Sequence, residues 1–238
     1  MKKTALTTAI LAASTVAQAQ LVDVNGGKWE GGTELGFTMI DGNTDTNSFI
    51  AGTDLINTRE FWKHSLGADA YYASEQGTRT AEQYNIQADT NREITDHVFI
   101  KGLAGWNKDN FSAFDYQTSL GLGLGAYLIK EDNHSLEFSV APGWRHSEFN
   151  AGGSDDEYIT ILGDKYSYGI NDKTRLFQTA DVSVGEDNTI TNAAVGITTE
   201  LAHDLALKAG YTIEHQTDVP AGTRNLDRKT TLTILYSY

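Results

Sequence analysis

The sequence predicts one all-β fold, a single antiparallel transmembrane β-barrel of the outer-membrane type with about 12 strands and both termini periplasmic. Three observations predict it. Apolar and polar residues alternate with a period of two along most of the chain. Short polar connections alternate with longer ones. Aromatic residues gather near the ends of the candidate strands, while aliphatic residues occupy the middles.

The start of the chain has the parts of a secretory signal peptide. Two lysines precede an apolar stretch over residues 5–16, and the small residues Ala17 and Ala19 mark a cleavage site. We expect cleavage after Ala19, which makes residues 1–19 a signal peptide. A periplasmic segment over residues 20–28 and a barrel over residues 29–238 would then follow.

The first and last strands show the alternation most clearly. In the first strand, Trp29, Leu35 and Phe37 share one face, and Glu34 lies on the other. The last strand places Leu232, Ile234, Tyr236 and Tyr238 on one face. Ten further strands of about 9–12 residues each are expected to begin near Asn47, Trp62, Glu82, His97, Phe114, Ser135, Tyr158, Arg175, Thr189 and Leu205.

The connections predict which end of each strand faces the periplasm. Tight turns are expected at residues 57–59, 93–96, 130–133, 171–173 and 202–204. Longer polar loops are expected at residues 41–46, 74–81, 107–113, 147–157 and 217–225, with residues 185–188 as a short exception. Outer-membrane barrels have short periplasmic turns and longer external loops, so this alternation favours a membrane barrel.

The two faces of the strands separate a membrane barrel from a soluble sandwich. A soluble core would hold its bulky aromatics in the middle, whereas here they form two bands that suit the headgroup levels. The polar face carries charges of both signs at mid-strand positions, which a hydrated lumen tolerates. We expect these side chains to line the pore: Glu34, Asp54, Lys63, Asp69, Asp89, Lys101, Asp115, Glu137, Arg145, Lys165, Arg175, Asp181, Lys208 and Glu214.

A few residues depart from the pattern. Asp164 and Gln178 fall on the lipid face, so either a bulge shifts the register there or Asp164 lies near the headgroups. Pro142, inside a strand, must remove a ladder hydrogen bond or mark a bulge. Three alternate glycines at positions 121, 123 and 125 point into the lumen, where they allow a bend or leave room for bulky groups.

Composition excludes several classes of function. The 238 residues include no cysteine, so no disulfide, thiol nucleophile or cysteine-ligated metal is expected. The formal net charge of −14 argues against nucleic acid as a partner. The acidic loops lack the spacing of an EF-hand. We therefore expect no cofactor and no dedicated metal site.

Several stretches resemble a known family. They are residues 29–49, Trp62-Lys63-His64, the glycine run at 121–125, residues 141–145 and the Tyr236-Ser237-Tyr238 ending. Together they resemble the salt-induced outer membrane protein family, a group of Gram-negative barrels without an assigned activity. The resemblance implies a Gram-negative outer-membrane location and a link to salt or osmotic stress. It implies no catalytic residue.

Three functions remain open from the sequence. The first is a narrow, porin-like passive pore for ions or small solutes, with a cation preference from the acidic excess of its lumen. The second is a structural, envelope-adaptation barrel whose acidic loops interact with lipopolysaccharide through divalent cations. The third is a hydrolase that uses His146 and the acids near it, although we expect no enzyme activity.

The expected partners follow from the predicted location. They are outer-membrane lipid and lipopolysaccharide, together with the barrel-assembly machinery. The ending formed by Leu232, Ile234, Tyr236 and Tyr238 resembles the C-terminal signal that this machinery reads. The sequence leaves the oligomeric state open, because lipid-facing and subunit-facing surfaces are both apolar.

Overall fold

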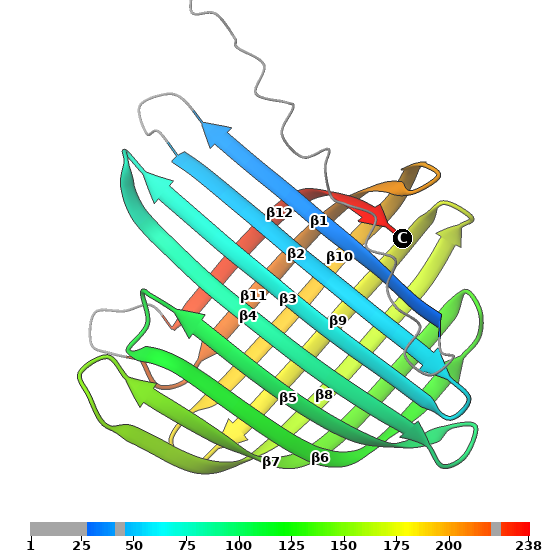
Figure 1. Cartoon of the computed structure of the whole chain (residues 1–238), viewed down its shortest axis with the longest axis horizontal. Helices are drawn as coiled ribbons and strands as arrows, with labels where there is room; N and C mark the ends of the chain where they lie inside the picture. Colours follow the sequence, from blue (N-terminus) through cyan, green and yellow to red (C-terminus); the bar gives the residue numbers. More distant parts are fainter. Residues whose placement is uncertain (1–27, 41–45, 220–224) are drawn as a thin grey trace, which may run out of the picture.

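The computed structural model describes residues 28–40, 46–219 and 225–238, and the predicted signal peptide and cleavage site lie outside these residues. Twelve antiparallel strands follow one another around a closed barrel, and β1 pairs with β12 to close it (Figure 1). This confirms the predicted fold class and strand number. The strands are β1 (Lys28–Ile40), β2 (Thr46–Arg59), β3 (Trp62–Glu75), β4 (Thr78–Glu93), β5 (Val98–Asp109), β6 (Phe114–Lys130), β7 (His134–Phe149), β8 (Ser154–Asn171), β9 (Thr174–Gly185), β10 (Thr189–Ala202), β11 (Leu205–Gln216) and β12 (Leu226–Ser237).

The connections at the expected external end are shorter than the sequence indicated. The loop expected at residues 74–81 is a two-residue turn, Gln76-Gly77, with φ angles of 50° and 77°. Positive φ at both central residues is the geometry of the tight hairpin turn that suits the strand twist. The loop expected at residues 147–157 shrinks to residues 150–153. Both expectations were wrong. The polar residues that were expected in these loops instead extend the neighbouring strands.

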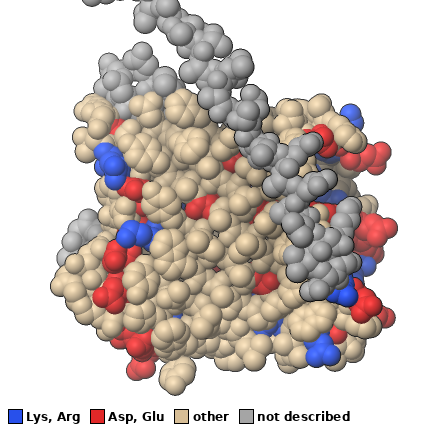
Figure 2. Space-filling view, in the orientation of Figure 1, with Lys and Arg blue, Asp and Glu red and all other residues tan. Residues whose placement is uncertain are grey.

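The barrel is apolar outside and polar inside. Phe37, Leu122 and Leu232 on its outer wall are each more than 60 % exposed. Several of the most buried side chains are charged, among them Lys101, Glu137 and Arg145. Charged side chains gather toward the two ends of the strands, and most of the wall between them is uncharged (Figure 2). Burial therefore follows the inverted pattern expected of a barrel surrounded by lipid.

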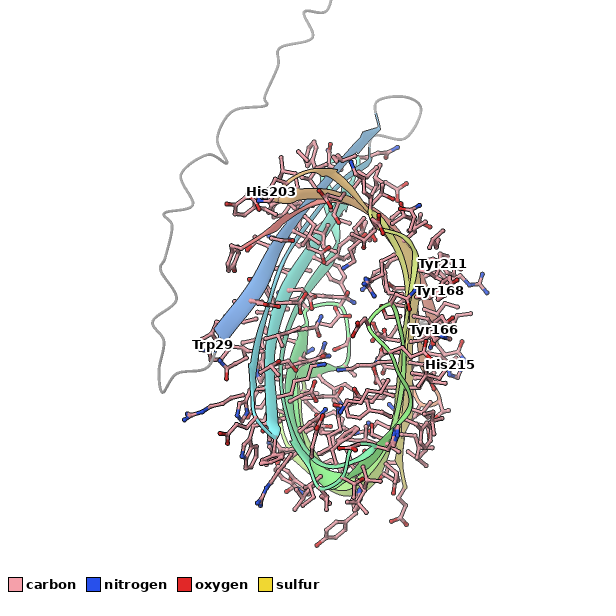
Figure 3. The ribbon with its side chains drawn as sticks, turned by 90° about the vertical axis from the view of Figure 1, so that its right-hand side faces the viewer. Trp29, Tyr166, Tyr168, His203, Tyr211 and His215 are labelled. Atoms are coloured by element: carbon pink, nitrogen blue, oxygen red, sulfur yellow. The ribbon has the colours of Figure 1, made fainter. Side chains whose placement is uncertain are left out.

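The barrel is flattened, with β1–β4 in one long wall and β8–β10 in the opposite one (Figure 3). Side chains from both walls extend into the narrow space between them. The described part of the chain contains no helix that is long and apolar enough to cross a membrane.

The glycines of β6 leave room for neighbouring groups, a bulky ring on the inner face at Gly125 and the backbone of β7 at Gly123. The Phe99 ring lies over Gly125, where an added Cβ would be 2.1 Å from a ring carbon. An added Cβ on Gly123 would be 2.0 Å from the Val140 carbonyl oxygen. The register between β6 and β7 is interrupted opposite Pro142 and resumes without a shift. Pro142 therefore removes ladder pairing and does not create a bulge.

Asp164 and Gln178 lie on the outer wall, as the alternation indicated. Asp164 is opposite Phe138 and Ala180, and Gln178 is opposite Tyr166. The register between β8 and β9 shifts only between Gly169 and Asn171. A bulge is therefore not the reason that these polar residues face outward.

Candidate functional site: the charged interior of the barrel

Contacts between non-neighbouring strands identify the inner face. Lys165 of β8 lies 3.5 Å from Asp89 of β4, although three strands separate them along the wall. Lys229 of β12 donates a hydrogen bond to Gln83 of β4. Such contacts can form only across the interior. Residues that share a ladder position with these side chains therefore point inward as well.

By this criterion thirteen of the fourteen residues expected in the pore lie on the inner face. Asp115 does not. It lies at the bulge between Phe114 and Tyr116, where its carboxylate forms an ion pair with the Lys108 ammonium at 2.5 Å. Lys108 is opposite Tyr84 on the outer wall. The bulge breaks the two-residue period, which is why alternation alone placed Asp115 inside.

A four-residue charged cluster crosses the middle of the lumen. The Lys101 ammonium lies 3.5 Å from one oxygen of Asp89 and 3.6 Å from Glu137. The second oxygen of Asp89 is 3.5 Å from Lys165 of the opposite wall. Lys101 is 7 % exposed and Lys165 is 53 % exposed, so the cluster extends from packed wall to open lumen. Two acids and two bases make the cluster neutral, and it narrows the space.

A second ion pair lies on the inner face near the external ends of β7 and β8. Arg145 donates to Glu157 from Nε at 2.8 Å and from a terminal nitrogen at 2.5 Å, with side chains 3 % and 8 % exposed. The guanidinium also donates to the Asn188 carbonyl at 2.6 Å. The Asn188 side-chain oxygen in turn accepts from the backbone nitrogens of Thr217 and Asp218. The pair thus ties the β9–β10 turn to β7 and β8.

Among the remaining inner charges of the middle, Glu34 has a cationic partner, and three aspartates have none within the described residues. Lys208 pairs with Glu34 at 3.0 Å. Asp69 accepts a hydrogen bond from Asn85 at 2.9 Å, and Asp181 accepts one from Asn192 at 3.0 Å. In the described part of the chain no Lys, Arg or His forms an ion pair with Asp54, Asp69 or Asp181. The middle of the lumen therefore carries an excess of negative charge.

Two inner residues were missed by sequence analysis. Glu157 was assigned to a loop, because strand β8 starts before the aromatic residue that seemed to open it. Lys229 lies on the polar face of the last strand and is not among the residues expected to line the pore. Its ammonium lies 5.0 Å from the centre of the Tyr71 ring, across the lumen. The length of β8 and the closure of the barrel decide these placements, and neither leaves a local signal.

His146, the hydrolase candidate, lies on the outer wall. Its Nδ1 is 2.8 Å from Asp156, its Nε2 is 3.7 Å from Glu148, and its ring stacks on Trp144 at 5.7 Å. No hydroxyl is recorded among the hydrogen bonds of this ring in the described residues. The described residues also contain no group of three or more His, Asp or Glu arranged to hold a metal.

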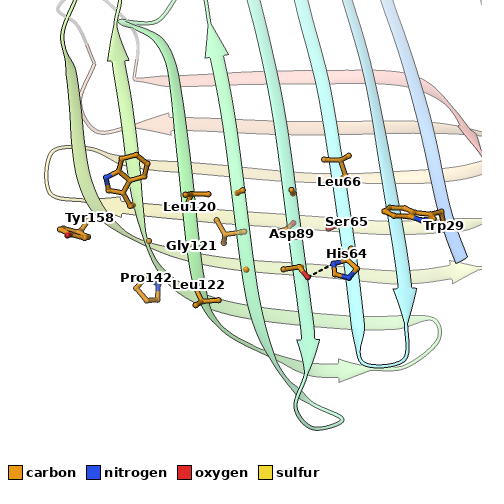
Figure 4. Close-up of a pocket in the computed structure, with 17 residues that line it drawn as sticks. Trp29, His64, Ser65, Leu66, Asp89, Leu120, Gly121, Leu122, Pro142 and Tyr158 are labelled. Atoms are coloured by element: carbon orange, nitrogen blue, oxygen red, sulfur yellow. Dashed lines mark hydrogen bonds between the residues drawn. The ribbon is translucent and has the colours of Figure 1, made fainter. Parts of the chain in front are cut away.

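A hollow of about 850 Å³ lies on the outer wall over β3–β8 (Figure 4). Its floor is made of small residues, Ala88, Gly102 and Ala104. His64 reaches it from β3 and shares a 2.8 Å hydrogen bond with Thr90. Most of its lining side chains belong to the outer wall, and Asp89 of the charged cluster is also among its lining residues.

The C-terminal aromatic residues lie at the seam that closes the barrel. Leu232, Ile234, Tyr236 and Tyr238 are all at least 41 % exposed. The backbone of Tyr238 both donates to and accepts from Gly31, at 2.9 Å each. The ladder between β1 and β12 pairs only four residues of each strand, fewer than at any other junction. The last residue therefore forms part of a short seam.

Comparisons with known proteins agree with this architecture. The sequence model of a family described as "Protein of unknown function, DUF481" matches residues 33–238. "Uncharacterized protein YdiY" of Escherichia coli (strain K12) is 24 % identical over 210 residues, covering 88 % of this chain and 83 % of that protein. The NanC porin structure is similar with a TM-score of 0.52 and 9 % identity, over 88 % of this chain and 98 % of that one. The translocator domain of autotransporter NalP from Neisseria meningitidis has a TM-score of 0.49 and 13 % sequence identity, over 88 % of this chain and 86 % of that one. At 9 % identity, the likeness to the NanC porin shows the barrel fold and nothing finer.

Proposed function

The chain belongs to the DUF481 family, and we propose that it is a narrow passive pore for ions or small solutes with a preference for cations. The observation that carries the proposal is the set of unpaired carboxylates, Asp54, Asp69 and Asp181, on the inner face at mid-strand positions. Three inner bases form no ion pair within the described residues. Lys63 and Arg175 lie one residue from the periplasmic ends of their strands, and Lys229 contacts Gln83 and the Tyr71 ring. Away from the strand ends, three unpaired acids thus outnumber one unpaired base. A permeating ion therefore meets net negative charge in the middle, which favours cations.

The interior supports a small conductance. Twelve strands enclose less space than the 16–18 strands of porins with open aqueous channels, because barrel diameter grows with strand number. The cluster around Asp89 and the contact of Lys229 with Gln83 both cross this space. Asp54 lies on the inner face of β2 and Asp69 on that of β3. The hydrated route that we propose therefore follows these two strands and passes the Lys229 side chain, which lies 5.0 Å from the Tyr71 ring of β3.

The location is part of the same proposal. Residues 1–19 would direct export, and the C-terminal residues would be read by the assembly machinery of a Gram-negative outer membrane. The resemblance to salt-induced outer membrane proteins adds a link to salt or osmotic stress. A growth defect of a deletion strain at high salt, rescued by the intact gene, would support that link.

The experiment for the pore uses the full mature protein in a planar lipid bilayer with a salt gradient across it. We expect small steps with a reversal potential on the cation-selective side. Replacing Asp54, Asp69 and Asp181 together by Asn should move the reversal potential toward zero. Asp156→Asn is the matched control, because this carboxylate lies on the outer wall beside His146. Steps without selectivity would refute the cation preference, and a silent bilayer with folded protein would refute the pore.

The alternative functions have less support. Several acids expected in or beside the external loops make contacts within the chain: Tyr84 donates to Glu82, Gln83 to Asp109 and Arg145 to Glu157. These contacts leave fewer free carboxylates for cation bridges to lipopolysaccharide. His146 has carboxylates beside it but no recorded nucleophile within the described residues. We therefore do not propose either function.

A further inference from the structure

The outer wall of β8 carries a carboxylate where lipid is expected. Asp164 projects from the same face as Leu162, Tyr166 and Tyr168, and Tyr166 and Tyr168 point away from the barrel in Figure 3. It is opposite Phe138 on one side and Ala180 on the other. Within the described residues, Asp164 has no recorded hydrogen bond or ion pair. An ionisable group on a lipid-facing wall is costly and marks a functional site, and the described part of the chain supplies no partner for this one.

A second unpartnered polar group lies beside Asp164. Gln178 of β9 is opposite Tyr166, one diagonal step from Asp164, and also faces outward. Its amide has two hydrogens to donate, and no partner is recorded for it in the described part of the chain. Ionised Asp164 only accepts hydrogen bonds. The wall therefore presents one acceptor and one donor, each without a partner.

The two groups lie at nearly the same height in the barrel. Rows of paired residues rise toward the external end as strand number increases: the row that contains Trp62, the first residue of β3, reaches His215 near the end of β11. Crossing from β8 to β9 along a row therefore moves toward the external end. Moving two residues along β8, from Asp164 to Tyr166, moves toward the periplasm, so the two displacements partly cancel in height. With strands about 4.8 Å apart, about 3.3 Å of rise per residue and a tilt of about 40°, the groups are about 8 Å apart around the wall and about 2 Å apart in height.

We propose that this face binds a second copy of the chain. A two-fold axis parallel to the membrane normal would pass between Asp164 and Gln178, so that each Asp164 accepts a hydrogen bond from the partner subunit's Gln178. The remaining corners of the patch, Ala180 and Tyr166, lie above and below the midpoint and would meet their own copies on the axis. An isologous interface requires such self-complementarity. The small Ala180 allows close approach of the two walls.

The acyl chains of lipids cannot make the same contacts. An acyl chain has no hydrogen-bond donor for the carboxylate, and it would leave the Gln178 amide unpaired as well. A second copy satisfies both groups at once, because the donor and the acceptor lie level on either side of one axis. This inference goes beyond the proposed pore and does not depend on whether the barrel conducts.

Cysteine crosslinking tests the interface directly, because the chain contains no cysteine. Ala180→Cys places one thiol beside the axis, and Ala104→Cys, on the outer wall of β5, is the matched control. The full-length protein is expressed in a Gram-negative host, its membranes are oxidised, and unheated samples are run without reductant. We expect Ala180→Cys to shift to the mass of a dimer and Ala104→Cys to stay at the mass of a monomer. A folded Ala180→Cys protein that stays monomeric overturns the proposal.

Two further variants test the role of the polar pair. In the Ala180→Cys background, Asp164→Ile should abolish the crosslink. The exchange of Asp164→Gln together with Gln178→Asp should restore it, because the symmetric contact is only reversed. Heat-modifiable mobility on the same gels shows whether each barrel is folded. A crosslink that survives Asp164→Ile undiminished, or an exchanged and folded variant that cannot crosslink, overturns the proposed contact.

Discussion

Two ion pairs of this barrel have the same length and different surroundings, and their loss should have different effects. Arg145 and Glu157 are 2.5 Å apart, with side chains 3 % and 8 % exposed. Lys108 and Asp115 are also 2.5 Å apart, with side chains 31 % and 47 % exposed. The perturbation is the removal of the acid from each pair, by Glu157→Ala or by Asp115→Ala.

Burial sets the expected magnitudes. Glu157→Ala leaves the Arg145 guanidinium inside the barrel wall with only the Asn188 carbonyl and Ser183 as recorded acceptors. Removing one partner of a buried pair lowers the free energy of unfolding by about 3–5 kcal/mol. Water can replace Asp115 beside Lys108, so that loss should be about 0.2–1 kcal/mol. Replacing Arg145 and Glu157 together by leucine should recover most of the larger loss, because no buried charge then remains unpaired.

The assay is unfolding in urea of the protein in lipid vesicles, followed by the fluorescence of its four tryptophans. Refolding curves must coincide with unfolding curves for the free energies to be comparable. Equal losses for Glu157→Ala and Asp115→Ala would contradict the role of burial, since distance alone would then set the energy. A double leucine variant no more stable than Glu157→Ala would refute the attribution to an unpaired buried charge.

Three other variants probe packing, the seam and the lumen. Gly125→Ala should lower the free energy of unfolding by about 1–3 kcal/mol, because the new Cβ overlaps the Phe99 ring; the same urea titration measures it. Deleting Tyr238 removes both backbone hydrogen bonds to Gly31 and should leave less folded barrel in the membrane, seen as loss of the heat-modifiable band. Lys229→Ala should raise single-channel conductance and cation preference, because it removes a cationic side chain that crosses the lumen; an unchanged current would show that the ion path lies elsewhere.

The alternation predicted the face of nearly every strand residue. It placed Trp29 outside and Glu34 inside, and it held Asp164 on the outer wall although a carboxylate is unfavourable there. It failed where the period breaks. The bulge at Asp115 moves that side chain out of the lumen, and a bulge leaves no clear mark in the sequence. The length of β8 was also underestimated, which hid Glu157.

The alternation of residues is sufficient to predict a barrel of about twelve strands with a charged inner face, because a period of two assigns each side chain to one side of a closed wall. Which inner charges meet depends on the closed sheet. Lys165 reaches Asp89, and Arg145 reaches Glu157, because of the flattening of the barrel and the register of its strands. Those properties belong to the closed sheet as a whole, and no local pattern of residues encodes them.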